Sequence, residues 1–369
     1  MKISVIIPVY KVAAFIADCL QSVLTQSYKD VEIVLVDDCS PDNSMEVAER
    51  ALAAYRGGMD VLRIRHDVNK GLSEARNSGI RAATGDYLYF LDSDDELAEG
   101  ALAALAAAAA DGLSDMVVGD YKVVGSDEFF PPLKLPAGRL MGRDTIIKAY
   151  MREKVYVMAW NKMVKRTFLL EHDLFFAPGI IHEDCLWSFQ CACLSTCWDV
   201  VRIPTYIYKV RPGSIKTASA VHHDIECLRM VLSAMVDSVK RYGLTGNKYV
   251  YCFLEEEKLR LLYTYLSAEL PEREITDDLY PFCRSLDYVH QWRPAWWSHL
   301  KTRYMVRDAH YYLSPQLQGQ YYVCVPRLLG VRSLHGGRRR LILWVLGTWL
   351  RYLCGMPRCS MPGVLGRGR

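Results

Sequence analysis

Hydrophobic and polar positions along the first 125 residues form alternating blocks of two kinds. Short continuous apolar runs, rich in β-branched residues, are typical of strands buried on both faces. Segments whose apolar residues recur every three to four positions are typical of helices with one buried face. The predicted strands are 3–9, 31–38, 61–64, 87–91 and 116–118, and the predicted helices are 12–24, 44–51, 72–83 and 101–110. This alternation predicts an α/β fold with a doubly wound sheet.

The pattern loosens beyond residue 125. Helical spacing returns at 143–151 and 183–196, with a strand-like run at 158–164 between them. From about 220 to 275 the spacing is mostly helical. Within this region we expect the charged run 255–258 to form a solvated helix face.

Charge is distributed unevenly along the chain. The last 69 residues carry 12 Lys or Arg and one acid, whereas the first 300 residues have a net charge of −8. A basic tail on an acidic body indicates an anionic partner for the tail. The apolar run 341–350 follows three arginines and is too short to span a bilayer.

The twelve cysteines follow no regular disulfide spacing, and residues 1–9 form a strand-like run rather than a secretory signal. These features predict a cytoplasmic protein with reduced thiols. Cys191, Cys193 and Cys197 are candidates for zinc ligands, but no second pair of ligands follows at a usable spacing. We therefore expect these three to be core cysteines.

Two common nucleotide-binding motifs are absent from the sequence. No Gly-x-Gly-x-x-Gly follows the first predicted strand, which disfavours an oxidoreductase that binds a dinucleotide. No Gly-Lys-Ser/Thr sequence is present either, which excludes a P-loop enzyme.

Acidic residues instead follow two of the predicted strands. Asp37 and Asp38 end the second strand, and Asp92, Asp94 and Asp95 follow the fourth. Ligands of doubly wound sheets bind at the carboxyl ends of the strands. A divalent cation that also binds a substrate diphosphate needs only one or two carboxylates from the protein. The segment 92–95 is either a cation site or an acidic turn that caps the next helix, and its position after a buried strand favours the cation site.

Asp38 and Arg76 each allow two interpretations. Asp38 can accept a hydrogen bond from a base imide or a ribose hydroxyl, or it can form an Asx-turn. Arg76 can offset the charge of a diphosphate. Its local surroundings favour the alternative, a surface arginine paired with Glu74 or Asp86.

Glu183 and Asp184 lie at the start of a predicted helix, between apolar residues on both sides. Acids in a first turn interact favourably with the helix dipole, which is the simpler explanation. The alternative is a general base, because a carboxylate beside a hydroxyl nucleophile can take its proton as the bond forms.

Four segments, in this order and spacing, resemble family-2 glycosyltransferases of the GT-A fold. They are SVIIPVY (4–10), VDDCSPDNS (36–44), NKGLSEARNSGIRAATGDYLYFLDSDDEL (69–97) and IHEDCLW (181–187). The resemblance covers about residues 1–220. Two further segments, AWNKMVKRTFLLEHDLFF (159–176) and YKVRPGSI (208–215), look like those that flank the acidic pair in bacterial members that build capsule, exopolysaccharide or lipopolysaccharide. The resemblance implies a mixed sheet flanked by helices, and inverting transfer of a sugar from a nucleotide sugar, most often a UDP-sugar.

The resemblance also implies roles for individual residues. Asp184 would deprotonate the acceptor hydroxyl, and Asp94, with Asp92, would bind Mn²⁺ or Mg²⁺. Asp38 would contact uracil or ribose. The other residues implied for the nucleotide sugar are Pro8, Tyr10, Asn69, Gly71, Arg76, Asp92 and Ser93. Those implied for the acceptor or sugar are Glu183, Trp160 and Trp187, although both tryptophans also suit the core.

The sequence departs from the processive members of this family. Those members carry a Gln-x-x-Arg-Trp signature and membrane helices, whereas the nearest segment here is QWRPAWW, residues 291–297. We therefore expect transfer of a single sugar or a few. The expected organisation is a catalytic domain (1–220), a helical extension (221–320) and a basic tail rich in tryptophan and leucine (321–369).

The tail resembles no segment of known function. Its arginines flank a short apolar helix, which favours a membrane surface, the inner face of the plasma membrane in a cytoplasmic protein. Packing on the chain itself or on another subunit is the alternative. Nucleic acid is disfavoured because no recognition motif accompanies the basic residues. A membrane surface also fits a lipid-linked acceptor.

Two other functions are compatible with parts of the sequence. One is a non-catalytic, nucleotide-sugar-binding or scaffold subunit of a polysaccharide assembly complex, but such a subunit does not need both Asp94 and Asp184. The other is a nucleotidyltransferase, which usually carries a Gly-rich basic loop after the first strand. The segment PVYKVAAF lacks that loop.

Overall fold

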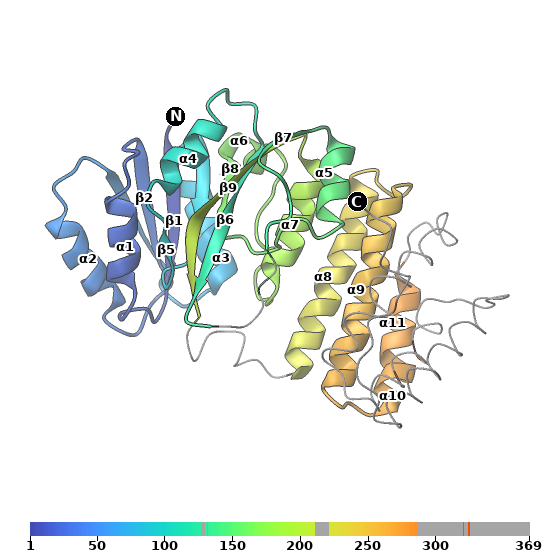
Figure 1. Cartoon of the computed structure of the whole chain (residues 1–369). Helices are drawn as coiled ribbons and strands as arrows, with labels where there is room; N and C mark the ends of the chain where they lie inside the picture. Colours follow the sequence, from blue (N-terminus) through green and yellow to red (C-terminus); the bar gives the residue numbers. More distant parts are fainter. Residues whose placement is uncertain (127–129, 131, 211–220, 287–319, 321–323, 325–369) are drawn as a thin grey trace, which may run out of the picture. The chain divides into compact units, whose positions relative to one another are not determined.

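The computed structural model describes residues 1–126, 130, 132–210, 221–286, 320 and 324 (Figure 1). These residues fall into two compact units that divide between Phe253 and Leu254. The predicted three-part organisation, with its boundary at residue 220, stays a prediction. The segment 291–297 and the apolar run 341–350 lie outside the described residues.

A nine-stranded sheet forms the centre of the first unit. Its strands are β1 (Ile3–Val9), β2 (Val31–Asp37), β3 (Asp60–Arg65), β4 (Tyr87–Phe90), β5 (Glu96–Leu97), β6 (Met116–Val124), β7 (Gly138–Met141), β8 (Lys162–Lys165) and β9 (Cys197–Lys209). The strand order is β3-β2-β1-β4-β8-β6-β9-β5, and β7 pairs with β9. Strands β1 to β4 are parallel, whereas β8 is antiparallel to both β4 and β6. The predicted doubly wound mixed sheet is therefore confirmed.

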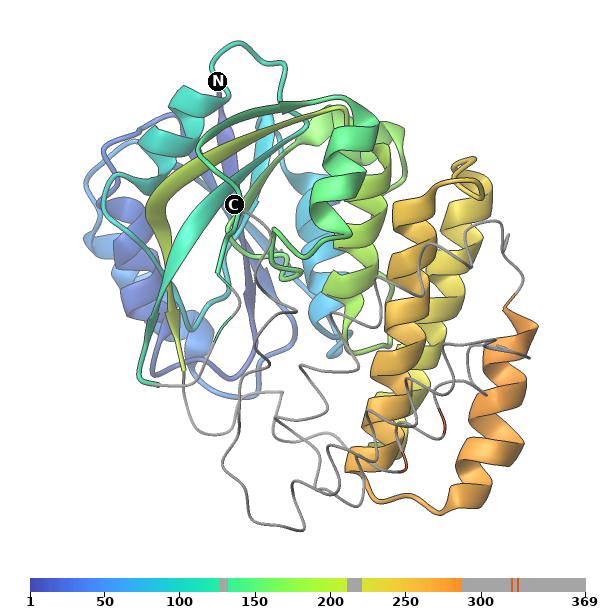
Figure 2. The same ribbon diagram turned by 45° about the vertical axis from the view of Figure 1, so that its right-hand side comes forward.

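Helices cover both faces of this sheet. Those of the first unit are α1 (Ile16–Leu24), α2 (Ser44–Ala54), α3 (Leu72–Ala82), α4 (Ala101–Ala108), α5 (Arg143–Tyr150), α6 (Arg166–Glu171), α7 (Glu183–Leu194) and α8 (Val221–Arg241). Figures 1 and 2 show α1, α2 and α4 on one face and α3, α5 and α7 on the other. Strand β1 is buried along its whole length, as its uninterrupted apolar sequence predicts.

The sheet opens at the carboxyl end of β1. Strand β4 pairs with β1 only as far as Ile6, so β1 continues beyond its neighbour. Pro8 lies in this overhang, where one edge of β1 no longer pairs with β4. A proline has no backbone N–H and cannot donate a hydrogen bond to a neighbouring strand. Pro8 is tolerated here because β1 and β4 have already separated at this position.

Helix α9 (Lys248–Ser267) continues from the first unit into the second, which also contains α10 (Glu272–Glu274), a π-helical segment (Ile275–Leu279) and α11 (Tyr280–Ser285). The expected solvated face at 255–258 is wrong. Glu255, Glu256 and Lys258 are at most 3% exposed. Lys258 Nζ lies 3.0 Å from Glu255 Oε1, and such pairing is what permits charged side chains to be buried.

The core cysteines of the first unit were predicted correctly. Cys191, Cys193 and Cys197 are at most 2% exposed, and burial raises the pKa of each thiol. Among the described residues, no three His, Cys, Asp or Glu side chains are grouped so that they alone could hold a metal ion.

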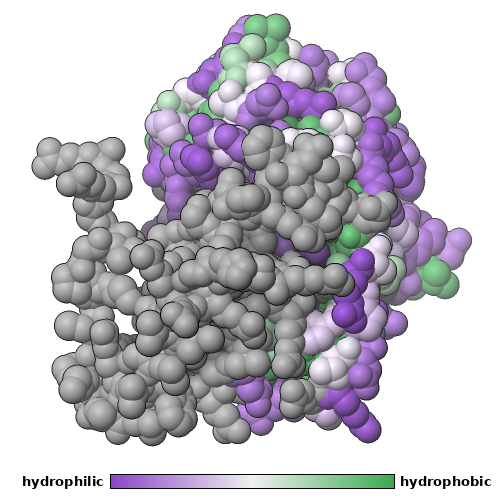
Figure 3. Space-filling model, turned by 90° about the vertical axis from the view of Figure 1, so that its right-hand side faces the viewer, coloured by the Kyte–Doolittle hydropathy of each residue, from purple (hydrophilic) through white to green (hydrophobic). Residues whose placement is uncertain are grey.

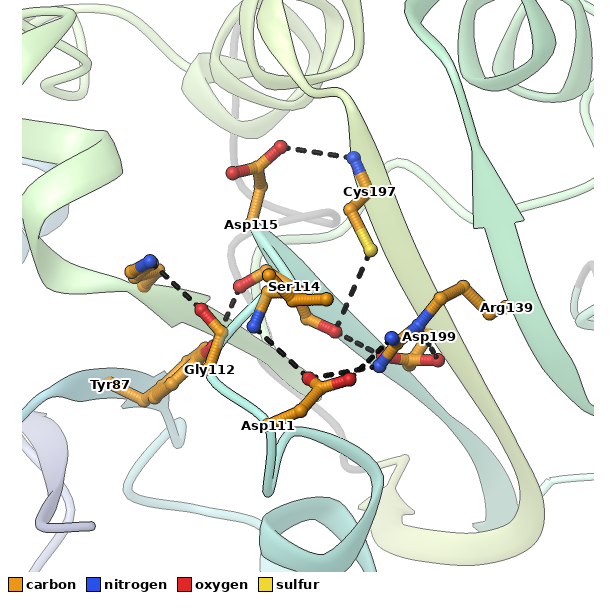
Figure 4. Close-up of polar contacts among 10 residues, drawn as sticks. Tyr87, Asp111, Gly112, Ser114, Asp115, Arg139, Cys197 and Asp199 are labelled. Carbon is orange, nitrogen blue, oxygen red and sulfur yellow. Dashed lines mark hydrogen bonds and ion pairs between the residues drawn. The ribbon is translucent and has the colours of Figure 1, made fainter.

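A polar cluster ties together the chain segments at the amino-terminal end of β9 (Figure 4). Arg139 on β7 donates to Asp199 on β9 at 2.7 Å and to Asp111 at 2.5 Å. Ser114 also donates to Asp199, and Tyr87 at the start of β4 donates to the Ser114 carbonyl at 2.7 Å. This cluster lies at the starts of β4, β6 and β9, so it stabilises the end of the sheet opposite to the acidic residues that follow β4.

No helix among the described residues is both long and apolar enough to cross a membrane. The described surface visible in Figure 3 is mostly hydrophilic, with hydrophobic residues scattered between.

The close packing of α3 on β1 gives a testable prediction. A Cβ added to Gly79 would lie 2.4 Å from Ile6 Cγ2, in a fully buried contact. Overpacking of this kind costs about 1–3 kcal/mol, which the better helix propensity of alanine offsets by at most about 1 kcal/mol. We expect Gly79→Ala to lower the melting temperature by several degrees. Gly58→Ala is the control, because a Cβ there meets nothing within 4 Å; equal melting temperatures for the two variants would contradict the packing argument.

Candidate active site

The acidic turn, residues 92–95, follows directly from β4. The Leu91 amide still donates to the Ile6 carbonyl, and the Asp95 amide donates to the Asp92 carbonyl at 3.0 Å, which closes the turn. The turn thus begins where the sheet ends, as the sequence predicted. Ser93 and Asp95 are buried, whereas Asp92 and Asp94 are partly exposed.

Asp95 fastens the acidic turn to β9. Its two carboxylate oxygens accept hydrogen bonds from the Tyr206 hydroxyl and the Lys209 amide, each at 2.7 Å. Burial raises the pKa of Asp95 to about 8, and the charges of Asp92 and Asp94 add to this effect. Asp95 is therefore a structural residue of the turn, with both oxygens occupied by β9.

Arg76 links the acidic turn to the start of α7. Its Nη2 donates to Asp92 Oδ1 and its Nη1 to Glu183 Oε1, both at 2.8 Å. The Arg76 side chain is 3% exposed, so the cation itself is buried, whereas Asp92 reaches solvent in part. Asp92 and Glu183 are 91 positions apart in the sequence, and one buried cation brings them together.

The expectation of a surface arginine at position 76 is wrong. Glu74 instead pairs with Arg81, and Asp86 accepts a hydrogen bond from the Lys2 amide. Local neighbours misled the prediction because the true partners lie far away in the sequence. With both Nη atoms facing carboxylates, Arg76 acts as a buried counter-charge, and a direct contact with a diphosphate stays a prediction.

Glu183 and Asp184 form the first turn of α7, as predicted. His182 precedes them in a left-handed conformation and lies 2.6 Å from Asp224 on α8. Glu183 is 9% exposed, and burial raises its pKa although Arg76 opposes that shift. Asp184 is more exposed than Glu183. The buried acid of the pair binds Arg76, and the adjacent one is left nearer to solvent.

Two buried polar residues, Lys162 and Asn161, had no role in the sequence-based prediction. Lys162, at the start of β8, is 1% exposed and donates to the carbonyls of Tyr156 and Met158. Burial lowers its pKa to about 7, and the nearby charge of Asp184 opposes this shift. Asn161 beside it has φ +59 and accepts hydrogen bonds from Tyr89 and Thr205. The segment AWNKMVK contains both residues, but the sequence alone does not show which groups they contact. Their burial and their hydrogen bonds are therefore visible only in the structure.

Asp38 organises the loop that precedes α3. Its carboxylate accepts hydrogen bonds from the Lys70 and Gly71 amides at 2.8 Å and lies 2.7 Å from His66 Nδ1. Gly71 has φ +86, a conformation that favours glycine. Asp38 is only 3% exposed. Its expected contact with uracil or ribose stays a prediction, whereas its role in shaping the loop is visible.

The other residues implied for the nucleotide surround this loop. Pro8 is buried at the sheet opening, and Tyr10, two residues further along the chain, is 39% exposed. Asn69 is exposed, two residues before the glycine that Asp38 holds. Pro8 and Tyr10 therefore lie at the carboxyl end of β1, and Asn69 lies in the loop that follows the carboxyl end of β3. The carboxyl ends of the strands are where a doubly wound sheet binds its ligand.

Both tryptophans implied for a sugar belong to the core, which corrects that expectation. Trp187 is fully buried and stacks on Phe176 at 4.7 Å between ring centroids. Trp160 is 5% exposed and stacks on Tyr206 at 4.5 Å. Because other rings cover these indoles, neither face is open to a sugar.

A surface cavity of about 600 Å³ lies on the α2 side of the sheet. It is lined by Asp37, Met45, Glu46, Glu49, Arg50, Arg63, Ile64 and Arg65. None of the residues predicted for the nucleotide sugar, the metal or the acceptor lines it.

The oxygen donors of the acidic turn fit a divalent cation that is shared with phosphate. Asp92 and Asp94 offer carboxylates that are partly exposed, and hard cations prefer such oxygen ligands. Asp95 cannot contribute without releasing β9. A site with one or two protein carboxylates therefore suits an ion that takes its remaining ligands from a diphosphate and water.

Comparison with known proteins gives a consistent result. A model of the family "Glycosyl transferase family 2" matches residues 4–172. The chain is 30% identical over 249 residues to the uncharacterized glycosyltransferase EpsJ of Bacillus subtilis (strain 168), a match that covers 66% of this chain and 71% of EpsJ. It is also 30% identical over 183 residues to the poly(ribitol-phosphate) beta-glucosyltransferase of Bacillus spizizenii, covering 49% of this chain but only 27% of that protein.

The fold also has a counterpart among solved structures. A crystal structure of S. aureus TarS 1-349 in complex with UDP-GlcNAc matches with a TM-score of 0.59 and 18% identity. The match covers 97% of this chain and 93% of that chain. This similarity confirms the expected GT-A-like fold.

The Arg76 ion pairs lead to a prediction about stability. Arg76→Met would leave Asp92 and Glu183 without their buried cation, and breaking such a pair costs about 3–5 kcal/mol of unfolding free energy. Arg81→Met on the same helix is the control, because Arg81 is half exposed and its pair contributes at most about 1 kcal/mol. Urea unfolding followed by circular dichroism measures both. Equal losses in the two variants would contradict the assigned role of Arg76.

Proposed function

The chain belongs to glycosyltransferase family 2, and on this basis we propose that it transfers a sugar with inversion from a nucleotide sugar to a glycan or lipid-linked acceptor. UDP is the expected nucleotide, and surface polysaccharide synthesis is the proposed setting. The observation that carries this proposal is the Arg76 bridge. It brings the acidic turn and the Glu183–Asp184 pair to one site beside the loop shaped by Asp38.

The choice of donor and acceptor class is supported by the proteins to which the chain is similar. TarS was crystallised with UDP-GlcNAc, and a curated relative is a poly(ribitol-phosphate) beta-glucosyltransferase. A nucleotide-sugar donor and a surface polymer acceptor are therefore reasonable for this chain. A panel of UDP-sugars tests which hexose or related sugar is moved.

We assign the chemical step to Asp184. A carboxylate beside the acceptor hydroxyl can take its proton as the oxygen attacks the anomeric carbon, while the bond from that carbon to the diphosphate breaks. Direct displacement inverts the configuration. Glu183 and Arg76 position the base, because their buried ion pair fixes the first turn of α7.

We assign the leaving diphosphate to the acidic turn. Asp94, with Asp92 beside it, would hold Mn²⁺ or Mg²⁺, and a bound ion of this kind neutralises charge on a leaving diphosphate. Ser93, Pro8, Tyr10, Asn69 and Gly71 would line the nucleotide side. Asp38 would act there chiefly by holding the loop amides.

The test is UDP release from a panel of UDP-sugars in the presence of Mn²⁺, with water as the acceptor. We expect slow release from one donor, and EDTA should reduce it. Asp184→Asn should lower the rate at least a hundredfold, since general base catalysis contributes about 10²–10⁴, while the dissociation constant for UDP changes less than threefold by calorimetry.

Asp173→Asn is the matched control, because Asp173 is an exposed acid outside the site. It should leave both the rate and UDP binding unchanged. No binding or release across the panel would overturn the proposal. Loss of UDP binding in Asp184→Asn would instead mean that Asp184 holds the donor.

For the basic tail we propose the inner face of the plasma membrane, where a lipid-linked acceptor would be available. Each basic residue near an anionic leaflet adds about 1 kcal/mol, so replacing Arg338, Arg339 and Arg340 by glutamine should weaken binding about a hundredfold. Co-flotation with vesicles containing phosphatidylglycerol measures this, with pure phosphatidylcholine vesicles as the control. Equal flotation of the variant and the native chain would argue against a membrane-binding tail.

A further inference from the structure

A column of aromatic rings runs through the second half of the sheet. Trp160 lies at its centre, stacked on Tyr206 at 4.5 Å and on Tyr156 at 5.4 Å between ring centroids. These three side chains are at most 5% exposed. This inner part of the column is ordinary core packing, and it forms a rigid support for the rings that lie above it.

The column does not end in the core. Tyr208, two residues after Tyr206 on β9, also stacks on Trp160, at 5.3 Å and 15° between ring planes. Tyr121 on β6 meets Trp160 edge-on at 5.0 Å, and Phe130 meets Tyr208 edge-on at 5.3 Å. Tyr121, Phe130 and Tyr208 are all partly exposed. The outer end of the column is therefore a set of aromatic rings at the surface, supported from below by a buried indole.

The outer rings lie beside the acidic turn. The amide of Lys209, the residue after Tyr208, donates to Asp95 at 2.7 Å. Tyr206 donates to the same carboxylate, and side chains two apart on a strand are about 7 Å from each other. Tyr208 therefore lies on β9 between the two residues that hold Asp95, and thus next to the turn to which we assign the diphosphate.

The sheet topology places these rings on the side of the acidic turn away from the nucleotide residues. Strand β6 is antiparallel to β8, which is antiparallel to β4, so β6 and its parallel partner β9 end at the same edge as β1, β2 and β4. In strand order, β1 and β2 lie on one side of β4, whereas β6 and β9 lie on the other. The donor nucleotide is assigned to the first side, which leaves the second side for the acceptor.

We propose that Tyr208 and Tyr121, with Phe130 at the rim, form the subsite for the pyranose ring of the acceptor. This inference rests on the proposed function and replaces the earlier expectation that Trp160 and Trp187 bind a sugar. The C–H-bearing face of a pyranose is apolar and carries slight positive charge, so it packs on the negative face of an aromatic ring.

The test is saturation-transfer NMR with methyl glycosides of glucose, galactose and N-acetylglucosamine. Saturating UDP and Mn²⁺ are present to occupy the donor side. The native chain should transfer saturation to ring protons of at least one glycoside. Tyr208→Leu keeps an apolar side chain but removes the ring, and it should raise the dissociation constant at least tenfold. Tyr208→Phe keeps the ring and should stay within threefold.

The control is Tyr55→Leu. Tyr55 follows the carboxyl end of α2, at the edge of the sheet opposite to the acidic turn, and it is also partly exposed. The Tyr55→Leu variant should bind the glycoside as the native chain does.

Unchanged binding in Tyr208→Leu, or no transfer of saturation to any glycoside while UDP is bound, would overturn the aromatic subsite and leave the transferase proposal standing. Failure of UDP itself to bind would overturn the transferase proposal and this subsite with it. A higher dissociation constant for UDP in Tyr208→Leu would mean that the outer rings bind the donor and not the acceptor, which would also contradict the inference.

Discussion

The site depends on one buried cation, the guanidinium of Arg76 between Asp92 and Glu183. Like charges at the end of a buried strand repel one another, and burial makes an uncompensated carboxylate costly. A single guanidinium offsets part of this cost for two acids that come from distant parts of the chain. It also fixes geometry, because both ion pairs form together only when α3, the acidic turn and α7 are correctly placed. The contact of Gly79 with Ile6 sets how closely α3 approaches the sheet, and hence where Arg76 lies.

The same constraint divides the acidic residues into two groups. In the acidic turn, Asp95 gives both oxygens to β9, while the neighbouring Asp94 is more exposed. At the start of α7, Glu183 binds Arg76, while the neighbouring Asp184 is more exposed. Each motif thus pairs an anchored acid with a neighbour nearer to solvent. Such an arrangement suits catalysis, because the group that reacts is placed by a second group whose own position is fixed by burial.

The sequence was sufficient for the first half of the sheet and insufficient for the second. Strands β1, β2 and β4 are short, mainly apolar runs, so their composition and length identify them without tertiary information. Strand β9 is interrupted by Arg202 and Pro204, yet it pairs with three other strands, which only the fold reveals. The partners of Arg76 were missed for the same reason: the acids close to it in sequence were more obvious than acids 16 and 107 positions away.

The aromatic residues show why residue type alone did not predict which rings reach the surface. Tryptophan has the largest apolar surface, and in this chain Trp160 and Trp187 gain most by complete burial among other rings. A tyrosine has an apolar ring and a polar hydroxyl, so it is stable with the ring partly buried and the hydroxyl near solvent. Tyr206 and Tyr208 point to the same side of β9, but only Tyr208 is close enough to the end of the strand to reach the surface. Position along the strand, rather than the size of the ring, therefore determines which aromatic side chain reaches the surface.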